Sequence, residues 1–240
     1  MLSIITVTFN NFDDLYRTLN SLNKVKGIEK IVVNGGECPK TKEYLSAFDG
    51  IAISEPDKGI SDAFNKGVSH ANGENVMFLN SGDILLSPDY LNEAETIIKF
   101  NPEISFVHSD LVFEDRISGD IRLTALQPFF FKAPPLGRGM PYHHQSMIVR
   151  KKVFEKTGLF KLHYKISMDF DWVCRLHKNG LGGFYWNKEP VVKMDGGGIS
   201  ALKENLVIWE SLQALKENQL LTLKIYMAFL FGLSFTLRDA

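Results

Sequence analysis

Hydrophobic and polar positions follow two alternating periods in the first part of the chain. Residues 3–9 form an apolar run rich in β-branched side chains, which predicts a buried strand. The next segment, 13–22, places Leu15, Leu19 and Leu22 at helical spacing. Further short apolar runs follow at 30–33, 51–54 and 76–79, with helical stretches between them. This alternation predicts an α/β fold with a doubly wound, mainly parallel sheet.

These apolar runs all end in polar or small residues. The endings read NN at 10–11, NGG at 34–36, EPD at 55–57 and NSGD at 80–83. Ligands of open α/β sheets bind beyond the carboxyl ends of the strands. We therefore expect these polar side chains to gather at one ligand-binding edge.

The pattern changes after residue 100. Two β-rich stretches, 104–114 and 121–124, flank a Ser-Gly-Asp turn at 118–120 and predict a hairpin. The aromatic and Pro/Gly-rich stretch 127–141 predicts a long loop that closes over bound substrates, although its three phenylalanines at 129–131 fit a core position equally well. A strand near 145–150, a helix over 169–178, a strand near 183–186 and a helical region from 200 onward follow.

Composition narrows the class of protein. The 240 residues, 45% hydrophobic, suffice for one α/β domain with an appendage or for two small domains. With a net charge of −1 and scattered basic residues, nucleic acid is not expected as a partner. Cys38 and Cys174 lack metal-type spacing and fit free thiols of a reducing compartment. The start of the sequence lacks the basic segment of a signal peptide, so we expect a cytoplasmic protein.

Two aspartates are candidates for chemistry. Asp83 closes a predicted strand behind the small residues Ser81 and Gly82, where its carboxylate could bind a hard divalent cation or form an Asx turn. Asp169 begins a predicted helix and could be its N-terminal cap or a general base.

Other polar residues favour structural interpretations. Asp171 lies four residues before Arg175, so an ordinary helix ion pair is the favoured reading. Asp62 and Lys66 have the same spacing, and a ligand-binding role competes with the ion pair there. For His144 and the adjacent histidine, hydrogen bonding is favoured over metal binding.

Together these stretches resemble family 2 of the inverting glycosyltransferases, which has the GT-A fold, and in particular bacterial enzymes of O-antigen and exopolysaccharide assembly. The likeness covers residues 2–200 in one order along the chain. It implies a nucleotide-sugar-binding half at 1–100 and an acceptor-binding half of the same domain at 101–200. A C-terminal helical segment at 201–240 would follow.

The resemblance also implies roles for individual residues. The nucleotide sugar would contact Thr6, Thr8, Asn10, Asn34, Asp57, Lys58, Gly59, Asp62, Asn65, Asn80 and Ser81. The acceptor or sugar side would include His144, Gln145, Asp171 and Gly197, with Asp169 as the base.

The chain departs from the family pattern at two places. Asn34 replaces the aspartate that usually receives the uracil N3 proton, and its carbonyl can still accept that proton. Asn80 and Gly82 replace acidic residues of the Asp-x-Asp metal motif, which leaves Asp83 as the only carboxylate of that motif for Mn²⁺ or Mg²⁺.

The resemblance therefore predicts transfer of a sugar, expected to be UDP-linked, to a hydroxyl of a glycan or a polyprenyl-diphosphate-linked sugar, with inversion. The alternative is a degenerate, non-catalytic nucleotide-sugar-binding subunit. The apolar stretch 220–237 has 18 residues, is interrupted by Lys224, and is expected to lie in the interface of the cytoplasmic membrane instead of spanning it. A plain core helix is the other alternative for this stretch. The oligomeric state is open between a monomer and a homodimer.

Overall fold

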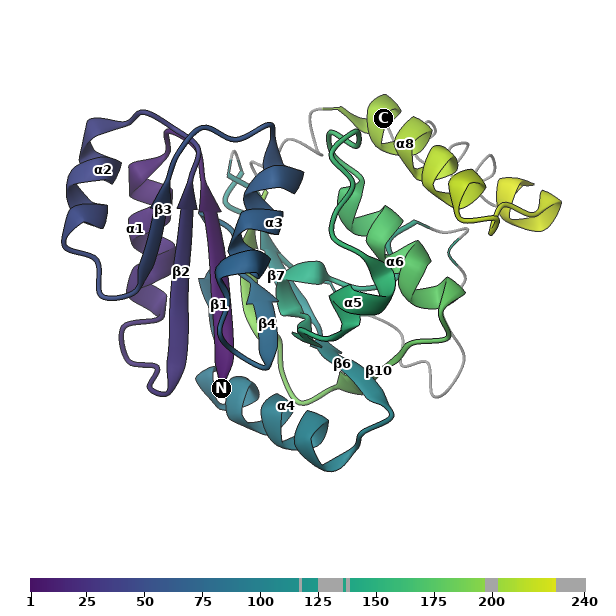
Figure 1. Cartoon of the computed structure of the whole chain (residues 1–240), viewed down its shortest axis with the longest axis horizontal. Helices are drawn as coiled ribbons and strands as arrows, with labels where there is room; N and C mark the ends of the chain where they lie inside the picture. Colours follow the sequence, from purple (N-terminus) through teal and green to yellow (C-terminus); the bar gives the residue numbers. More distant parts are fainter. Residues whose placement is uncertain (117, 125–135, 137–138, 197–202, 228–240) are drawn as a thin grey trace.

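The larger of two β-sheets forms the centre of the protein. The structure, a computed structural model, describes residues 1–116, 118–124, 136, 139–196 and 203–227. Its seven-stranded sheet has the order β10-β6-β9-β4-β1-β2-β3 (Figure 1). The strands are β1 (Leu2–Thr8), β2 (Ile28–Asn34), β3 (Ile51–Ser54), β4 (Asn75–Phe78), β6 (Ile104–Ser109), β9 (Ile148–Arg150) and β10 (Gly182–Trp186). Only β9 runs antiparallel to its neighbours in this sheet, which confirms the predicted mainly parallel α/β fold.

Helices cover both faces of this sheet because successive side chains of a strand point to opposite faces. In β1, Ile5 belongs to a core cluster with Phe64 of α3 (Ile60–His70). Leu2 and Ile4 belong to another cluster with Tyr90 of α4 (Pro88–Phe100). Helices α1 (Phe12–Ser21) and α2 (Pro39–Ser46) pack near β2 at one end of the molecule (Figure 1).

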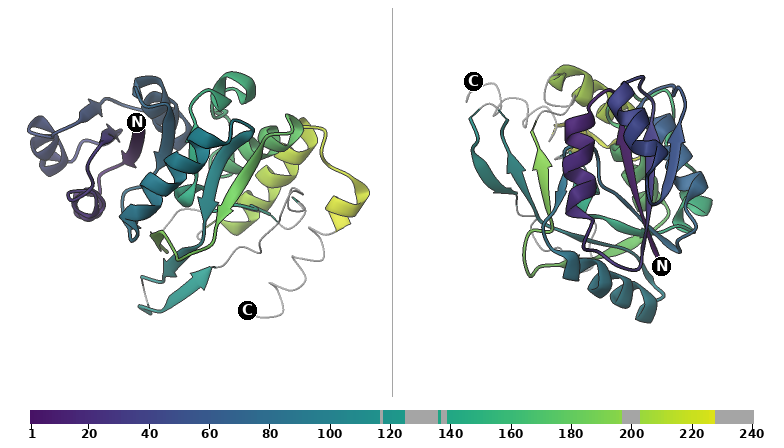
Figure 2. Two further views of the ribbon diagram at one scale, coloured as in Figure 1. Left: turned by 90° about the horizontal axis from the view of Figure 1, so that it is seen from below. Right: turned by 90° about the vertical axis from the view of Figure 1, so that its left-hand side faces the viewer.

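A second sheet lies beside the first and carries the predicted hairpin. Its order is β5-β11-β7-β8, with β5 (Ile84–Leu85), β7 (Leu111–Glu114), β8 (Ile121–Thr124) and β11 (Val192–Asp195). Strands β7 and β8 pair antiparallel, as the sequence predicts, and β11 lies next to them (Figure 2). The single strand expected over 104–114 is wrong, because the chain leaves the large sheet after Ser109 and enters the small one at Leu111.

Helical elements of the second half gather at the other end of the molecule (Figure 1). They are α5 (Val153–Thr157), α6 (Met168–Lys178) and α8 (Glu204–Glu217). The short 3-10 helix η2 (His144–Ser146) instead contacts strands β4, β6 and β11. Ala214 and Leu215 of α8 are fully buried in the core cluster that contains Trp172 of α6. Helix α8 therefore packs against α6 and contributes to the same core.

The stretch expected at a membrane interface is described only as far as residue 227. Leu220, Leu221 and Ile225 pack partly buried against the same core cluster, whereas Leu223 is 78% exposed. Among the described residues, no helix is both long and apolar enough to cross a bilayer. Residues 228–240, most of the predicted loop 127–141 and the predicted site residue Gly197 lie outside the described part.

Candidate active site

A tight turn follows β4 at the carboxyl edge of the large sheet. The Asp83 N–H donates to the Asn80 carbonyl (2.9 Å), and the Asp83 carboxylate accepts the Asn80 N–H (3.2 Å). Gly82 has a φ of +107°, a left-handed conformation that favours glycine. Its N–H donates to the hydroxyl of Thr18 on α1 (2.9 Å). The sequence NSGD is therefore suited to this turn, whatever ligand the turn binds.

Asp83 is a buried carboxylate, only 3% exposed. Its second oxygen accepts the main-chain N–H of Asp195 (3.2 Å). Burial raises the pKa of Asp83 to about 7, against the lowering effects of the two main-chain hydrogen bonds and the nearby His144. Asp83 therefore closes its own turn, as one of the two predicted alternatives has it, but it does not cap the following helix, whose N-cap is Ser87.

A second carboxylate lies against this turn, and the sequence interpretation missed it. A Cβ atom added to Gly82 would lie 3.3 Å from Oδ2 of Asp195, the last residue of β11. Asp195 pairs with Arg116 (2.5 Å) and Arg17 (3.2 Å), and Arg116 also pairs with Asp14 (2.5 Å). Burial would raise the pKa of Asp14, but hydrogen bonds from both arginines lower it. The signal that could have identified Asp195 is its position directly after the short stretch VVKM at 191–194 and directly before Gly196.

The oxygen atoms around the turn suit a hard cation. Buried Oδ1 of Asn80 and Oγ of Ser81 have no hydrogen-bond partner within the described residues. Both lie in the turn that Asp83 closes, with the Asp195 carboxylate beside Gly82. Carboxylate, amide and hydroxyl oxygens are ligands of Mg²⁺ and Mn²⁺. In the described part of the chain, however, no three His, Cys, Asp or Glu side chains form a metal-binding group. A cation held at this turn would therefore need further oxygen ligands, such as water or a phosphate.

His144 joins this turn to the first turn of α6. Its Nδ1 lies 3.2 Å from Oδ2 of Asp169, and its Nε2 lies 3.4 Å from Nδ2 of Asn80. The side chains of His144 and Asp169 are both 22% exposed. Ser167 is the N-cap of α6, so Asp169 lies in the first turn of the helix, where the helix dipole favours a carboxylate. Candidate residues from the two halves of the chain thus meet at His144.

An apolar floor supports this meeting point. His144 and Asp169 line a small cavity together with aromatic side chains of the core. Phe64 and Phe78 stack there with ring centroids 4.4 Å apart, and Phe160 meets both edge-on. Close packing of rings restricts the positions that the neighbouring polar groups can take.

The residues at the end of β1 that are expected to contact the nucleotide have different surroundings. Asn10 has a φ of +55°, and its Oδ1 accepts the N–H groups of Glu37 (2.8 Å) and Cys38 (3.0 Å) at the start of α2. Thr8 donates to the side chain of Asn11 (2.5 Å). Thr6 is buried within β1, and its hydroxyl has no hydrogen-bond partner within the described residues.

Asn34, at the end of β2, is fully buried. Its Oδ1 accepts the Gly36 N–H (3.1 Å), and its Nδ2 donates to the Gly36 carbonyl (3.1 Å) and the Ser54 hydroxyl (2.9 Å). A uracil would therefore have to share a carbonyl oxygen that already serves the turn. An amide oxygen has two lone pairs, so such sharing is chemically feasible.

The stretch 57–66 brings the end of β3 against the end of β2. A Cβ atom on Gly35 would overlap the Asp57 carboxylate, which accepts the Gly59 N–H (2.9 Å). Asp62 accepts the Lys58 N–H (3.0 Å) and lies 3.5 Å from Lys66. The predicted helix ion pair is therefore present, while Lys58 and Gly59 lie exposed at the start of α3.

Three further predicted site residues have their polar groups occupied inside the protein. Both ends of the Asn65 amide bond the main chain of Phe160 (2.8 and 2.9 Å). Gln145 is buried and donates to the sulfur of Met194 (2.8 Å). Asp171 is fully buried and bonds three side chains, those of Lys161, Arg175 and Asn218 (each 2.9 Å). The predicted ion pair of Asp171 with Arg175 is therefore present, and the Asp171 side chain is not exposed to an acceptor.

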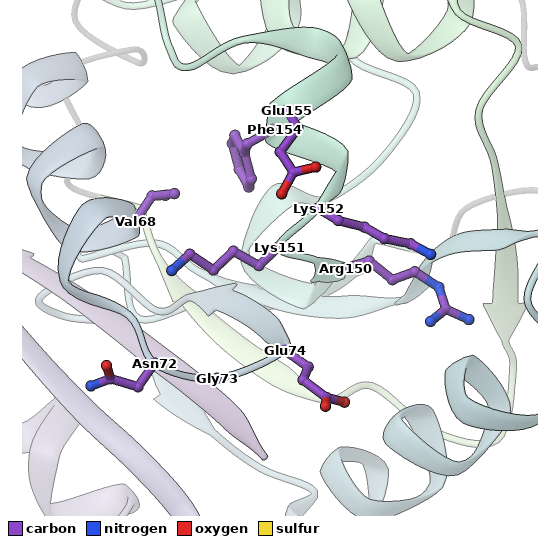
Figure 3. Close-up of a pocket in the computed structure, with 9 residues that line it drawn as sticks. All are labelled: Val68, Asn72, Gly73, Glu74, Arg150, Lys151, Lys152, Phe154 and Glu155. Atoms are coloured by element: carbon purple, nitrogen blue, oxygen red, sulfur yellow. The ribbon is translucent and has the colours of Figure 1, made fainter.

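A larger pocket, of about 650 Å³, lies away from these residues (Figure 3). It opens near the amino end of β4, where Gly73 and Glu74 meet the end of β9. Two of its cations are already engaged, because Arg150 donates to the carbonyl of Ile104 (2.8 Å) and Lys151 to that of Ala71. The carboxyl edge with His144 and Asp169 remains the candidate active site.

The sequence of the chain is similar to those of known glycosyltransferases. The chain is 33% identical over 183 residues to an uncharacterised glycosyltransferase of Mycobacterium tuberculosis, covering 72% of this chain and 67% of the relative. It is 27% identical over 190 residues to a PGL/p-HBAD biosynthesis glycosyltransferase of Mycobacterium bovis, covering 75% of this chain and 70% of the relative.

Solved structures share the fold at low sequence identity. The TarS structure from S. aureus in complex with UDP-GlcNAc has a TM-score of 0.71 at 14% identity and covers 97% of this chain and 71% of its own. The UDP complex of TarS is matched over 65% of its length, with a TM-score of 0.64, 16% identity and 88% of this chain covered. A mannosyltransferase from Pyrobaculum calidifontis in complex with GDP-Man and Mn²⁺ has a TM-score of 0.64 at 12% identity, covering 97% of this chain and 73% of its own. The sequence profile of Glycosyl transferase family 2 matches residues 3–158, and the chain belongs to that family.

Proposed function

We propose that this glycosyltransferase moves one sugar from a UDP-linked donor to a hydroxyl of a glycan or polyprenyl-diphosphate-linked sugar, with inversion. The observation that carries the proposal is the position of His144. It lies within 3.4 Å of Asn80 in the turn after β4 and within 3.2 Å of Asp169 on α6. A donor site and a base must lie this close for the acceptor oxygen to reach the anomeric carbon.

The reaction is a single displacement. Asp169 accepts the proton of the acceptor hydroxyl, and the acceptor oxygen bonds to the anomeric carbon. The bond from that carbon to the diphosphate oxygen breaks, and its electron pair leaves with UDP. His144 lies 3.2 Å from Oδ2 of Asp169, so its ring restricts the orientation of the carboxylate. Attack from the face opposite the leaving group inverts the configuration.

Charge on the leaving diphosphate has two sources of compensation. A divalent cation, Mn²⁺ or Mg²⁺, would be held by Asp83 with the free oxygens of Asn80 and Ser81, and would neutralise the diphosphate. Arg17 and Arg116 add guanidinium groups at the same edge, where they pair with Asp195. The Mn²⁺ complex of the related mannosyltransferase fold supports the cation.

The donor and acceptor classes rest on relatives. TarS structures contain UDP and UDP-GlcNAc, which supports a nucleotide sugar with a uracil base. The mycobacterial relative is named for PGL/p-HBAD biosynthesis, which supports synthesis of a glycolipid or of another surface glycan.

Peripheral association with the cytoplasmic membrane completes the proposal. Trp209 on α8 is 61% exposed, Leu223 is 78% exposed, and Tyr226 and Met227 are each at least 40% exposed. Aromatic and aliphatic side chains beside Lys224 suit the boundary between head groups and acyl chains.

UDP release from a panel of UDP-sugars, with a polyprenyl-diphosphate-linked sugar as acceptor, tests the proposal. We expect UDP release that depends on the acceptor and falls when EDTA removes divalent cations. A non-catalytic binding subunit would bind UDP, as measured by thermal stabilisation, yet release none. That outcome would overturn the proposed function.

A further inference from the structure

A residue from the C-terminal part of the chain holds the loop that leads into Asp169. Glu210 of α8 accepts three main-chain N–H groups, those of Lys165 (2.7 Å), Ile166 (2.9 Å) and Ser167 (2.8 Å). The Glu210 side chain is almost fully buried, with the residue only 2% exposed. Because all three donors are main-chain groups of consecutive residues, the Glu210 carboxylate fixes the path of this loop.

The loop needs such an acceptor because of its place before a helix. The first N–H groups of a helix, and those just ahead of it, have no carbonyl partner within the helix. Ser167 is the N-cap of α6, but its side chain makes no capping hydrogen bond and donates to the carbonyl of Val207 on α8 (3.3 Å). Glu210 therefore serves as the acceptor that the loop lacks, and its negative charge faces the positive end of the α6 dipole.

Asp169 follows this anchored segment by two residues. Its carboxylate lies 3.2 Å from His144, which in turn lies 3.4 Å from Asn80. A displacement of residues 165–167 would move the start of α6 and change this distance. We infer that Glu210 is the positioning residue for the base Asp169, an inference that rests on the proposed function.

A matched control lies on the same helix. Glu217 of α8 pairs with the side chains of Lys161 (2.9 Å) and His163 (3.4 Å). Within the described residues, it accepts no main-chain N–H of the loop before α6. Glu217→Gln removes a carboxylate from the same helix and retains its size, as Glu210→Gln does. Faster exchange at residues 165–167 in Glu210→Gln but not in Glu217→Gln is the result expected from loss of the three main-chain hydrogen bonds.

Hydrogen exchange tests the positioning without any turnover. We expect the amides of residues 165–167 to exchange at least about tenfold faster in Glu210→Gln than in the wild type, because a glutamine amide offers one acceptor oxygen in place of two. Exchange in Glu217→Gln should remain at the wild-type rate. Equal rates in the wild type and Glu210→Gln would overturn the inference, and this result is independent of whether the protein turns over a UDP-sugar.

A double-mutant cycle tests the route to catalysis. Glu210→Gln should lower kcat by roughly 10-fold to 100-fold, with an unchanged Kd for UDP, since small displacements of catalytic groups have effects of this size. In the Asp169→Asn background the same substitution should change the residual rate by less than about twofold. An equal loss in both backgrounds would show that Glu210 does not act through Asp169 and would overturn the inference.

Folding is monitored by circular dichroism and Tm throughout. If Glu210→Gln does not fold, Glu210→Asp takes its place in both experiments, because it keeps the charge and shortens the reach by one methylene. Faster exchange at 165–167 with reduced kcat in Glu210→Asp is the expected result. Wild-type exchange and kcat in that variant would contradict the inference.

Discussion

The two edges that meet at His144 use their carboxylates differently. On the donor side, Asp83 is 3% exposed and both of its oxygens accept main-chain N–H groups. On the proposed acceptor side, the Asp169 side chain is 22% exposed; its Oδ1 accepts the Phe170 N–H (2.8 Å), and its Oδ2 lies 3.2 Å from Nδ1 of His144. The turn after β4 is thus held by its own hydrogen bonds, while Asp169, the proposed base, is the more exposed of the two carboxylates.

The same contrast recurs within α6. Asp171, two residues after Asp169, is fully buried and bonded to Lys161, Arg175 and Asn218. Two aspartates on one helix therefore have different environments, since one points to the core and the other to the open edge. Within α6, burial and bonded partners, and not residue type, distinguish Asp171 from the proposed base Asp169. Three aspartate substitutions test this difference between carboxylates, and an arginine substitution tests the charges around Asp195.

The largest effect is expected at Asp83 in metal-free protein. Its pKa is raised from the usual value near 3.8 to about 7, so between these values the folded protein binds more protons than the unfolded chain. The contribution of this group is therefore most favourable at low pH and declines as the pH rises toward 7, by at most about 4 kcal/mol. Asp83→Asn lacks this titration. Its free energy of unfolding relative to the wild type should therefore rise as the pH increases from 4 to 8, as measured by urea unfolding. Parallel curves for the two proteins would contradict a raised pKa.

The next effect concerns Asp171. Asp171→Asn leaves Arg175 and Lys161 without their buried counter-charge, so the free energy of unfolding should fall by about 3 kcal/mol. The kcat of the folded fraction should change by less than about threefold, because the residue does not face the open edge. Thermal unfolding and initial rates on the same sample check both parts. A stable variant with low kcat would instead place Asp171 in the reaction.

Asp169→Asn is expected to show the opposite profile. It keeps the shape of the side chain but cannot accept a proton, so kcat should fall by roughly 100-fold or more. The Tm and the Kd for UDP should match the wild type, with Asp171→Asn as the control. If the variant unfolds or loses UDP affinity while keeping kcat, the base is another residue.

Arg116→Ala should have the smallest effect. Arg116 is 46% exposed at its side chain and pairs with Asp14 and Asp195, so its removal costs little stability. If it also helps to neutralise the diphosphate, the Kd for UDP should rise by about fivefold, with a smaller rise for uridine. Calorimetric titrations with both ligands measure this. Equal changes for UDP and uridine would remove Arg116 from diphosphate binding.

Much of the architecture could be predicted from the chain alone. The apolar runs at 3–9, 30–33 and 76–79 became strands β1, β2 and β4 because local periodicity determines which faces are buried. The hairpin around Gly119 could also be predicted from local sequence, because a short turn joins its two strands. The stretch 104–114 was different, because its division between two sheets depends on strands that lie far away in the sequence.

The sequence by itself determined the family, the α/β fold and the identity of the candidate aspartates, because motifs and periodicity are local properties of a chain. Only the tertiary structure decided which of those side chains are free to act. Asn65 bonds the main chain of Phe160, 95 residues away, and Asp195 lies against Gly82 across 113 residues of chain. Asp171 bonds Arg175, as its local spacing predicts, but also Asn218, 47 residues away. Burial and hydrogen-bond partners depend on such long-range contacts, and no local pattern records them.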